Sequence, residues 1–154
     1  MAPELAFEDF APGRFFDLGT VVVDREEMVA FARRFDPQPF HVDEQAGKES
    51  MFGALAASGW FTAGLWMRTY VDGVLTHAAA LGSPGGEEIA WPAPVFAGDE
   101  LRASMEVVEA RLSRSRPTMG LVKLRGWMHR GDEVVFRSTF TGMFGTRDAS
   151  SSYG

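Results

Sequence analysis

The sequence predicts a single α+β domain in which an antiparallel sheet wraps around a long buried helix. Residues 59–72, GWFTAGLWMRTYVD, are apolar on nearly every face, which is typical of a helix that protein encloses on most sides. In the C-terminal third, apolar and polar residues alternate over 101–107 and 134–140, as they do in half-buried strands. A chain of 154 residues can form one domain with a substantial core, and a sheet curved around the helix is its simplest packing.

The N-terminal elements follow from local signals. Residues 13–23 are rich in β-prone side chains and predict a strand. Asp24 then has the character of a helix N-cap, with Glu27 three positions later completing a capping box. Apolar residues follow at helical spacing, and this helix must end at Asp36 because Pro37 disfavours helical geometry in the residue before it.

The middle of the chain is predicted to form loops before and after the buried helix. Residues 36–43 form a proline-containing loop, and a short polar segment extends to residue 50. LGSPGGEE, residues 81–88, is expected to be a flexible surface connection, since no phosphate-binding lysine follows its glycines.

The C-terminal part adds one more β-like run and an end to the domain. Residues 119–128 predict a strand, and HRGD at 129–132 predicts a hairpin turn that leads into the last strand. The domain is expected to span residues 1–146, followed by a disordered tail over 147–154.

Composition excludes several classes of function. The net charge of −6 argues against broad binding to nucleic acid or to an anionic membrane. The chain has no cysteine, which excludes disulfides, thiolate metal sites and cysteine nucleophiles. Its three histidines lack the spacing of a zinc site, so no metal is expected. No signal peptide or membrane span is recognisable, and we expect a cytoplasmic protein.

The stretch FDPQPFHVD carries the first candidate for chemistry. Asp36 and His41 lie five residues apart on a backbone whose φ angles are fixed at Pro37 and Pro39, which lowers the entropy lost in holding both side chains. If the two side chains converge, they can share one water and perform general acid–base catalysis near neutral pH. The alternative is that Asp36 ends a turn and His41 is an ordinary loop residue. His77 and His129 are expected to be structural or solvent-exposed.

Ser58 and Gly59 open the predicted buried helix and form the second candidate. A glycine lets a ligand approach the backbone closely, and the N–H groups of the first turn have no partner within the helix. This partly positive end suits a developing oxyanion. The alternative is that Ser58 only caps the helix and Gly59 is only a packing contact.

Together these stretches resemble the MaoC-like dehydratases, the hot-dog-fold group that includes the (R)-specific enoyl-CoA hydratases. The family's motif D-x-N-P-x-H-x-D reads DPQPFHVD at residues 36–43, and its FG-x-x-I-A-H-G-M reads FGALAASGW. WPAPVFAGDEL resembles its KPV-x-x-GD-x-L, and the likeness covers roughly residues 7–146. Three positions depart from the family pattern: Gln38 replaces an asparagine, Ser58 a histidine, and Gly64 a serine that helps to fix the catalytic loop.

The resemblance implies a hot dog that pairs into a homodimer, or a larger homo-oligomer, through its sheet. It also implies the interconversion of a trans-2-enoyl thioester and an (R)-3-hydroxyacyl thioester. Asp36 would be the base for the water, His41 its proton-donating partner, and the Gly59 N–H would polarise the thioester carbonyl. Neither a metal nor a redox cofactor is implied; CoA enters as part of the substrate, although an acyl carrier protein is not excluded.

Several further residues are expected to bind that substrate. Cations in and near the segment RLSRSRP could hold the phosphates of CoA, although a solvated hairpin turn is the alternative: Arg111, Arg114, Arg116, Lys123 and Arg125. Ser58 is expected to contact substrate. An apolar tunnel for the acyl group would draw on side chains for which core packing is the alternative role: Trp60, Phe61, Trp66 and Met67.

Two other functions remain open on this fold. An acyl-CoA thioesterase would also use a carboxylate near the central helix, but usually lacks the Asp-x4-His loop. A non-catalytic acyl-thioester-binding subunit would be indicated by loss of Asp36 or His41, and both are present. The sequence does not distinguish acyl chain lengths.

Overall fold

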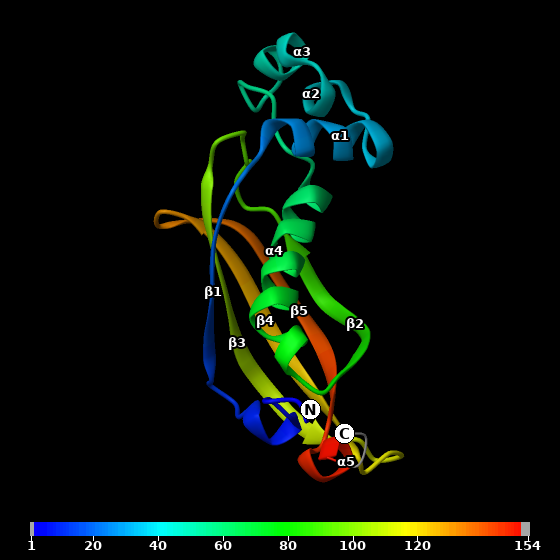
Figure 1. The fold of residues 1–154 in the computed structure, drawn as a ribbon. Helices are drawn as coiled ribbons and strands as arrows, with labels where there is room; N and C mark the ends of the chain where they lie inside the picture. Colours follow the sequence, from blue (N-terminus) through cyan, green and yellow to red (C-terminus); the bar gives the residue numbers. More distant parts are fainter. Residues whose placement is uncertain (1, 152–154) are drawn as a thin grey trace.

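A computed structural model describes residues 2–151 of the chain. Five strands and a long helix make up the body of the molecule, and short helices precede the long one (Figure 1). In chain order the elements are η1 Phe7–Asp9, β1 Phe15–Val22, α1 Arg25–Phe35, α2 Pro39–Val42, α3 Glu44–Glu49, α4 Gly59–Gly73, η2 Leu75–His77, β2 Ala80–Ala90, β3 Glu100–Leu112, β4 Met119–Arg130, β5 Glu133–Gly145 and α5 Arg147–Ser151.

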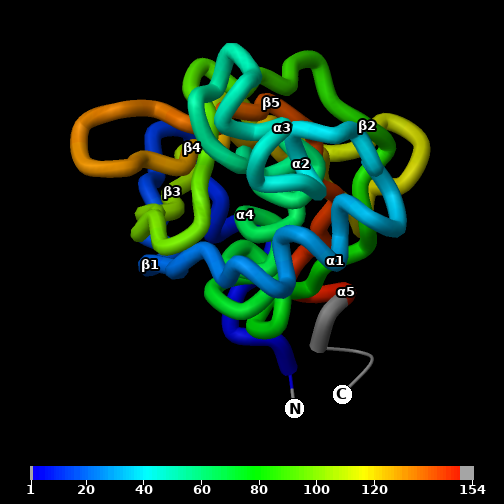
Figure 2. The backbone as a smooth tube through the Cα atoms, turned by 90° about the horizontal axis from the view of Figure 1, so that it is seen from above, coloured from blue at the N-terminus to red at the C-terminus, as the bar shows by residue number. Residues whose placement is uncertain are grey.

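All five strands form one antiparallel sheet in the order β1-β3-β4-β5-β2. The sheet curves around α4, which runs along its concave face, and a view from above places α4 near the centre of the chain's path (Figures 1 and 2). This arrangement confirms the predicted α+β fold with a sheet wrapped around a long central helix. No helix among residues 2–151 is both long and apolar enough to cross a membrane.

The buried face of α4 is aromatic where it meets the sheet. Trp66 and Tyr70 stack on each other with ring centroids 5.1 Å apart, and both meet Phe140 edge-on. Gly126 on β4 leaves room for the Trp66 ring: a Cβ at this position would lie 2.4 Å from it. The close approach of helix and sheet therefore depends on a residue without a side chain at that point.

Helix α1 begins and ends where the sequence predicts. The Asp24 carboxylate accepts a hydrogen bond of 2.9 Å from the Glu27 N–H, and the helix ends at Phe35. Asp36 follows as the C-cap, and its N–H donates to the Ala32 carbonyl. The predicted N-cap and the proline stop are confirmed, and α1 lies above the start of α4 (Figure 1).

The expected loop at residues 81–88 is wrong, because this segment lies within β2 and pairs with β5. All residues of β2 except the last are exposed, so the strand carries no alternating pattern that sequence could reveal. Its pairing shifts register at several points, and Gly82 and Gly85 have φ angles of 107° and 146° that favour glycine. A proline is tolerated at position 84 because β2 is an edge strand.

Two other segments are more ordered than expected. The proline-containing loop includes the helical turn α2, and the polar segment after it forms α3. The segment predicted as a disordered tail begins with α5, where the Arg147 N–H donates to Glu8 and its guanidinium pairs with Asp9. Residues 152–154 of that predicted tail lie outside the described residues.

Candidate active site

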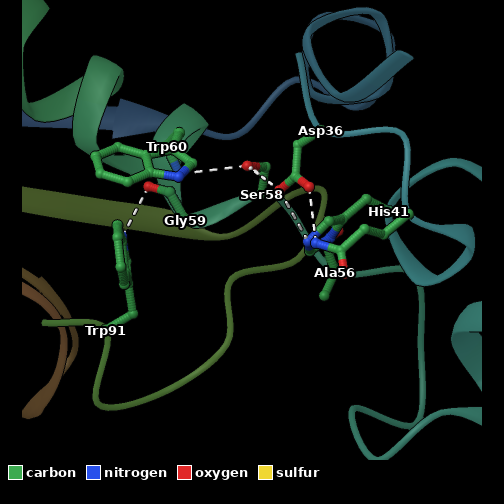
Figure 3. Close-up of polar contacts among 8 residues, drawn as sticks. Asp36, His41, Ala56, Ser58, Gly59, Trp60 and Trp91 are labelled. Atoms are coloured by element: carbon green, nitrogen blue, oxygen red, sulfur yellow. Dashed lines mark hydrogen bonds and ion pairs between the residues drawn. The ribbon is translucent and has the colours of Figure 1, made fainter. Parts of the chain in front are cut away.

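Asp36 and His41 face each other beside the residues that open α4 (Figure 3). Asp36 ends α1, whereas His41 lies on the helical turn α2, which Pro39 opens. His41 Nε2 is 3.4 Å from Asp36 Oδ2, and the imidazole is almost fully buried. The five-residue spacing therefore does bring the two side chains together, through a proline-initiated turn rather than an extended loop.

The second ring nitrogen of His41 determines how the pair can hold a proton. His41 Nδ1 lies 2.7 Å from the Ala56 carbonyl oxygen, which can only accept a hydrogen bond. Nδ1 must therefore carry a hydrogen, and in the neutral ring Nε2 has a lone pair. A proton on Nε2 turns the contact with the Asp36 carboxylate into an attractive ion pair, so this is the position from which His41 can give or take a proton.

Asp36 is held by two further hydrogen bonds. Gln38 Nε2 donates to Oδ1 at 2.7 Å, and Ser58 Oγ donates to Oδ2 at 2.8 Å. Burial raises the pKa of the Asp36 carboxyl, but these two bonds and the nearby His41 outweigh it and hold the pKa below 3.8. Asp36 is therefore an ionised proton acceptor with a fixed orientation at neutral pH.

Ser58 joins this carboxylate to the start of α4. Its hydroxyl also accepts a hydrogen bond of 3.3 Å from the Trp60 N–H, which makes Ser58 the N-cap of the helix. Ser58 is completely buried and its one hydroxyl hydrogen points to Asp36, so the expected contact of Ser58 with substrate stays a prediction. Ser58 is therefore both the cap and a positioning residue for Asp36.

Gly59 is the first residue of α4, so its N–H has no acceptor within the helix. It lines a cavity of about 480 Å³ together with Asp36, His41 and Trp60. The exposed indoles of Trp60 and Trp91 meet edge-on at the side of this cavity, with ring centroids 5.2 Å apart. One cavity thus contains a carboxylate, an imidazole and the positive end of a 15-residue helix.

A second, more apolar cavity of about 350 Å³ lies further along α4, between this helix and strands β2 and β5. Of the residues expected to form an acyl tunnel, Trp66 and Met67 line it, whereas Phe61 packs against Phe31 in the core. Ile89 on β2 lines the same cavity and lies two residues before Trp91 in the sequence. The two cavities therefore follow one side of α4 in succession.

The predicted phosphate-binding cations do not lie at this site. Arg114 and Arg116 lie on the exposed β3–β4 connection, at the end of the sheet away from the N-terminus of α4 (Figure 1). Lys123 on β4 forms ion pairs with Glu87 at 2.7 Å and Glu109 at 3.7 Å. Within one protomer, then, the structure unites Asp36, His41, Ser58, Gly59 and Trp60 and leaves Arg114, Arg116 and Lys123 apart.

Sequence reasoning missed two contributors to the site. Gln38, noted only as a departure from the family pattern, holds the free oxygen of Asp36. Trp91 lies far along the chain, and only its packing against Gly59 shows that it belongs here. Among the described residues, no three side chains of the metal-ligating kinds lie together.

Comparison with known proteins agrees with this geometry. The model of the MaoC like domain matches residues 9–124, about three quarters of the chain. The chain belongs to the MaoC-like family. A MaoC-like dehydratase from Rhodospirillum rubrum is 39% identical, with a TM-score of 0.82 over 92% of this chain and 97% of that one.

Two more distant structures share the fold. An (R)-hydratase from A. caviae involved in PHA biosynthesis is 21% identical, with a TM-score of 0.62 over 88% of this MaoC-like chain and 96% of the hydratase. Rv0216 from Mycobacterium tuberculosis, which has a double hot-dog fold, is 19% identical, with a TM-score of 0.74 over 92% of this chain and 44% of its own. The predicted family and hot-dog fold are confirmed.

Proposed function

We propose that this MaoC-like protein reversibly hydrates trans-2-enoyl thioesters to (R)-3-hydroxyacyl thioesters, with CoA as the carrier. The observation that carries the proposal is the Asp36–His41 pair, which faces the same cavity as the first backbone N–H of α4. The likeness to the R. rubrum dehydratase supports the reaction class. The (R) configuration rests on the family resemblance alone.

In this mechanism, a water lies between Asp36 and His41 beside C3 of the bound enoyl group. Asp36 takes one proton from the water while the oxygen of the water bonds to C3. The electron pair of the C2=C3 bond moves to give an enolate, whose oxygen accepts a hydrogen bond from the Gly59 N–H. His41 gives its Nε2 proton to C2, and the proton on Asp36 then returns to His41 Nε2 across the 3.4 Å contact.

The reaction as proposed needs neither a metal nor a redox cofactor. The thioester carbonyl already activates C3, so positioned water and an oxyanion site are enough. The acyl chain would leave the reacting carbons along α4 and enter the second cavity, whose lining is largely apolar.

A panel of trans-2-enoyl-CoAs with short, medium and long chains tests the proposal. We expect loss of the conjugated-thioester absorbance without release of free thiol, and a chiral analysis of the product should give the (R) alcohol. The Asp36→Asn variant is the matched blank. Thiol release would instead indicate a thioesterase, and binding of every thioester without turnover would indicate an acyl-thioester-binding subunit; either result contradicts the hydratase.

A further inference from the structure

Trp91 forms a hydrogen bond that bears directly on the proposed oxyanion site. Its side chain extends from the residue after β2 to the start of α4, and its indole N–H donates to the Gly59 carbonyl oxygen at 2.7 Å (Figure 3). The same indole lines the cavity that contains Asp36 and His41. Trp91 is therefore adjacent to the site without belonging to the acid–base pair.

The peptide group between Gly59 and Trp60 is held at both of its polar ends. Trp91 holds the carbonyl of this group, and Ser58 Oγ accepts from its N–H at 3.3 Å. Because a peptide group is planar and rigid, two bonds on opposite edges fix its orientation. The Gly59 N–H is one residue earlier, so fixing this plane restricts the backbone rotation that would swing that donor away from the cavity.

Packing reinforces the same restraint. A Cβ built on Gly59 would lie 2.5 Å from the Trp91 ring, so the indole occupies the space that any side chain at position 59 would need. Gly59 does not have a positive φ angle, and its backbone conformation therefore does not require glycine. The Trp91 ring is the reason for a glycine here, and the ring covers the Gly59 backbone from one side.

A short chain of bonds also links Trp91 to the catalytic base. Trp91 holds the Gly59–Trp60 peptide, that peptide donates to Ser58, and Ser58 donates to Asp36 at 2.8 Å. The first and last links join segments far apart in the sequence, and the middle link lies within the start of α4. The proposed oxyanion donor and the proposed base are thus held by the same chain of hydrogen bonds, which begins at Trp91.

We propose that Trp91 is a positioning residue, which holds the Gly59 N–H in the orientation that stabilises the enolate oxygen. The inference rests on the proposed hydratase function. It assigns Trp91 a role in turnover rather than in ground-state binding, because the indole N–H is used on the backbone and not on substrate.

Trp91→Phe is the test, since it removes the N–H donor and keeps a smaller aromatic ring at this position. A misplaced catalytic group costs up to about 100-fold, so we expect kcat to fall by about 10- to 100-fold. KM and the affinity for a saturated acyl-CoA should change little, because ground-state contacts remain. Trp127→Phe on β4 is the matched control: it makes the same chemical change outside both cavities and should keep wild-type kcat.

A second measurement does not depend on activity. Amide hydrogen exchange of Trp60 should become faster in Trp91→Phe, because its peptide group loses the indole hydrogen bond at the carbonyl, whereas amides in β4 should be unchanged. Unchanged Trp60 exchange overturns the positioning role even if no thioester is a substrate. If the wild type is active, two kinetic results also overturn the positioning role. One is an unchanged kcat in Trp91→Phe, and the other is an equal loss of kcat in Trp91→Phe and Trp127→Phe.

Discussion

Asp36 receives more polar contacts than a turn-ending residue needs. Gln38, Ser58 and His41 all contact its carboxylate, and they come from two segments, the turn α2 with its cap and the start of α4. If Asp36 only ended α1, its backbone N–H bond to Ala32 would suffice. The three side-chain contacts fix the direction of the carboxylate, and this is what a proton acceptor for one water requires.

We expect Asp36→Asn and His41→Ala each to lower hydratase turnover by about 10²- to 10⁴-fold. Asparagine can hold the water but cannot take its proton, and alanine removes the proton carried by Nε2. The double variant should be hardly worse than the poorer single one, because residues that act as a unit are non-additive. Turnover and melting temperature are measured on the same preparations.

Asp24→Asn is the control for these variants. Asp24 caps α1 through the Glu27 N–H, and asparagine caps helices about as well as aspartate, so both turnover and stability should stay at the wild-type level. Near-wild-type turnover in either Asp36→Asn or His41→Ala, on a confirmed substrate, would end the acid–base mechanism.

At the scale of elements, one glycine on α4 and one on the strand β4 beneath it have opposite surroundings. Gly64 is exposed, and a Cβ at this position would meet nothing within 4 Å. The family's serine at this position helps to fix the catalytic loop, but in this protomer a side chain at position 64 would point into open space. Gly126 on β4 instead lies directly under the buried ring of Trp66.

These surroundings predict opposite effects of the same substitution. Gly64→Ala should stabilise the protein by about 0.5–1 kcal/mol, because alanine favours the helix. Gly126→Ala should destabilise it by about 1–3 kcal/mol, since the added methyl group overpacks the contact between α4 and the sheet. Denaturant unfolding of the two variants and wild type measures both. A loss of stability in Gly64→Ala would contradict an open surface there and point to a covering partner.

At the scale of the whole molecule, the sheet has two edge strands, β1 and β2. Among the described residues, β2 pairs with β5 on one side and with no strand on the other, and its Leu81 and Ile89 are exposed. Met67 on α4 is also exposed and shares a cavity with Ile89. A free edge beside apolar side chains favours association with a second copy.

We expect a homodimer in which the two copies of β2 pair in antiparallel fashion. Light scattering at micromolar concentration should give twice the mass of one chain. Leu81→Lys places a charge on the edge and should shift the protein towards monomer, whereas Leu112→Lys, at a similarly exposed leucine on β3, should not. A monomeric wild type would contradict this assembly.

Such a dimer would also bear on the separated arginines. A two-fold axis through paired β2 strands reverses the direction of the partner, so the end that carries Arg114 and Arg116 in one protomer lies at the same end as the Asp36–His41 site of the other. Phosphate binding by these residues would then depend on the partner subunit. Arg114→Ala with Arg116→Ala would be expected to raise KM for CoA thioesters without lowering kcat.

Local signals in the sequence determined much of this protein. The Asp24 cap and Pro37 set the limits of α1, the all-round apolar run set α4, and the alternating residues of the C-terminal third set three strands. The approach of Asp36 to His41 was one of two outcomes that the local sequence allowed, because two prolines and a short spacing favour it without requiring it. Each of these features depends on residues close together in the chain.

Only the tertiary structure decided the rest. Strand β2 exists because β5 pairs with it, and an exposed, glycine-rich edge has no pattern of its own. Trp91 reaches Gly59 across 32 residues, and Ser58 reaches Asp36 across 22, so neither contact leaves a local signal. The physical reason is that in each case the partners are far apart in the chain, so they meet only when their helices, strands and loops pack together in the folded protein.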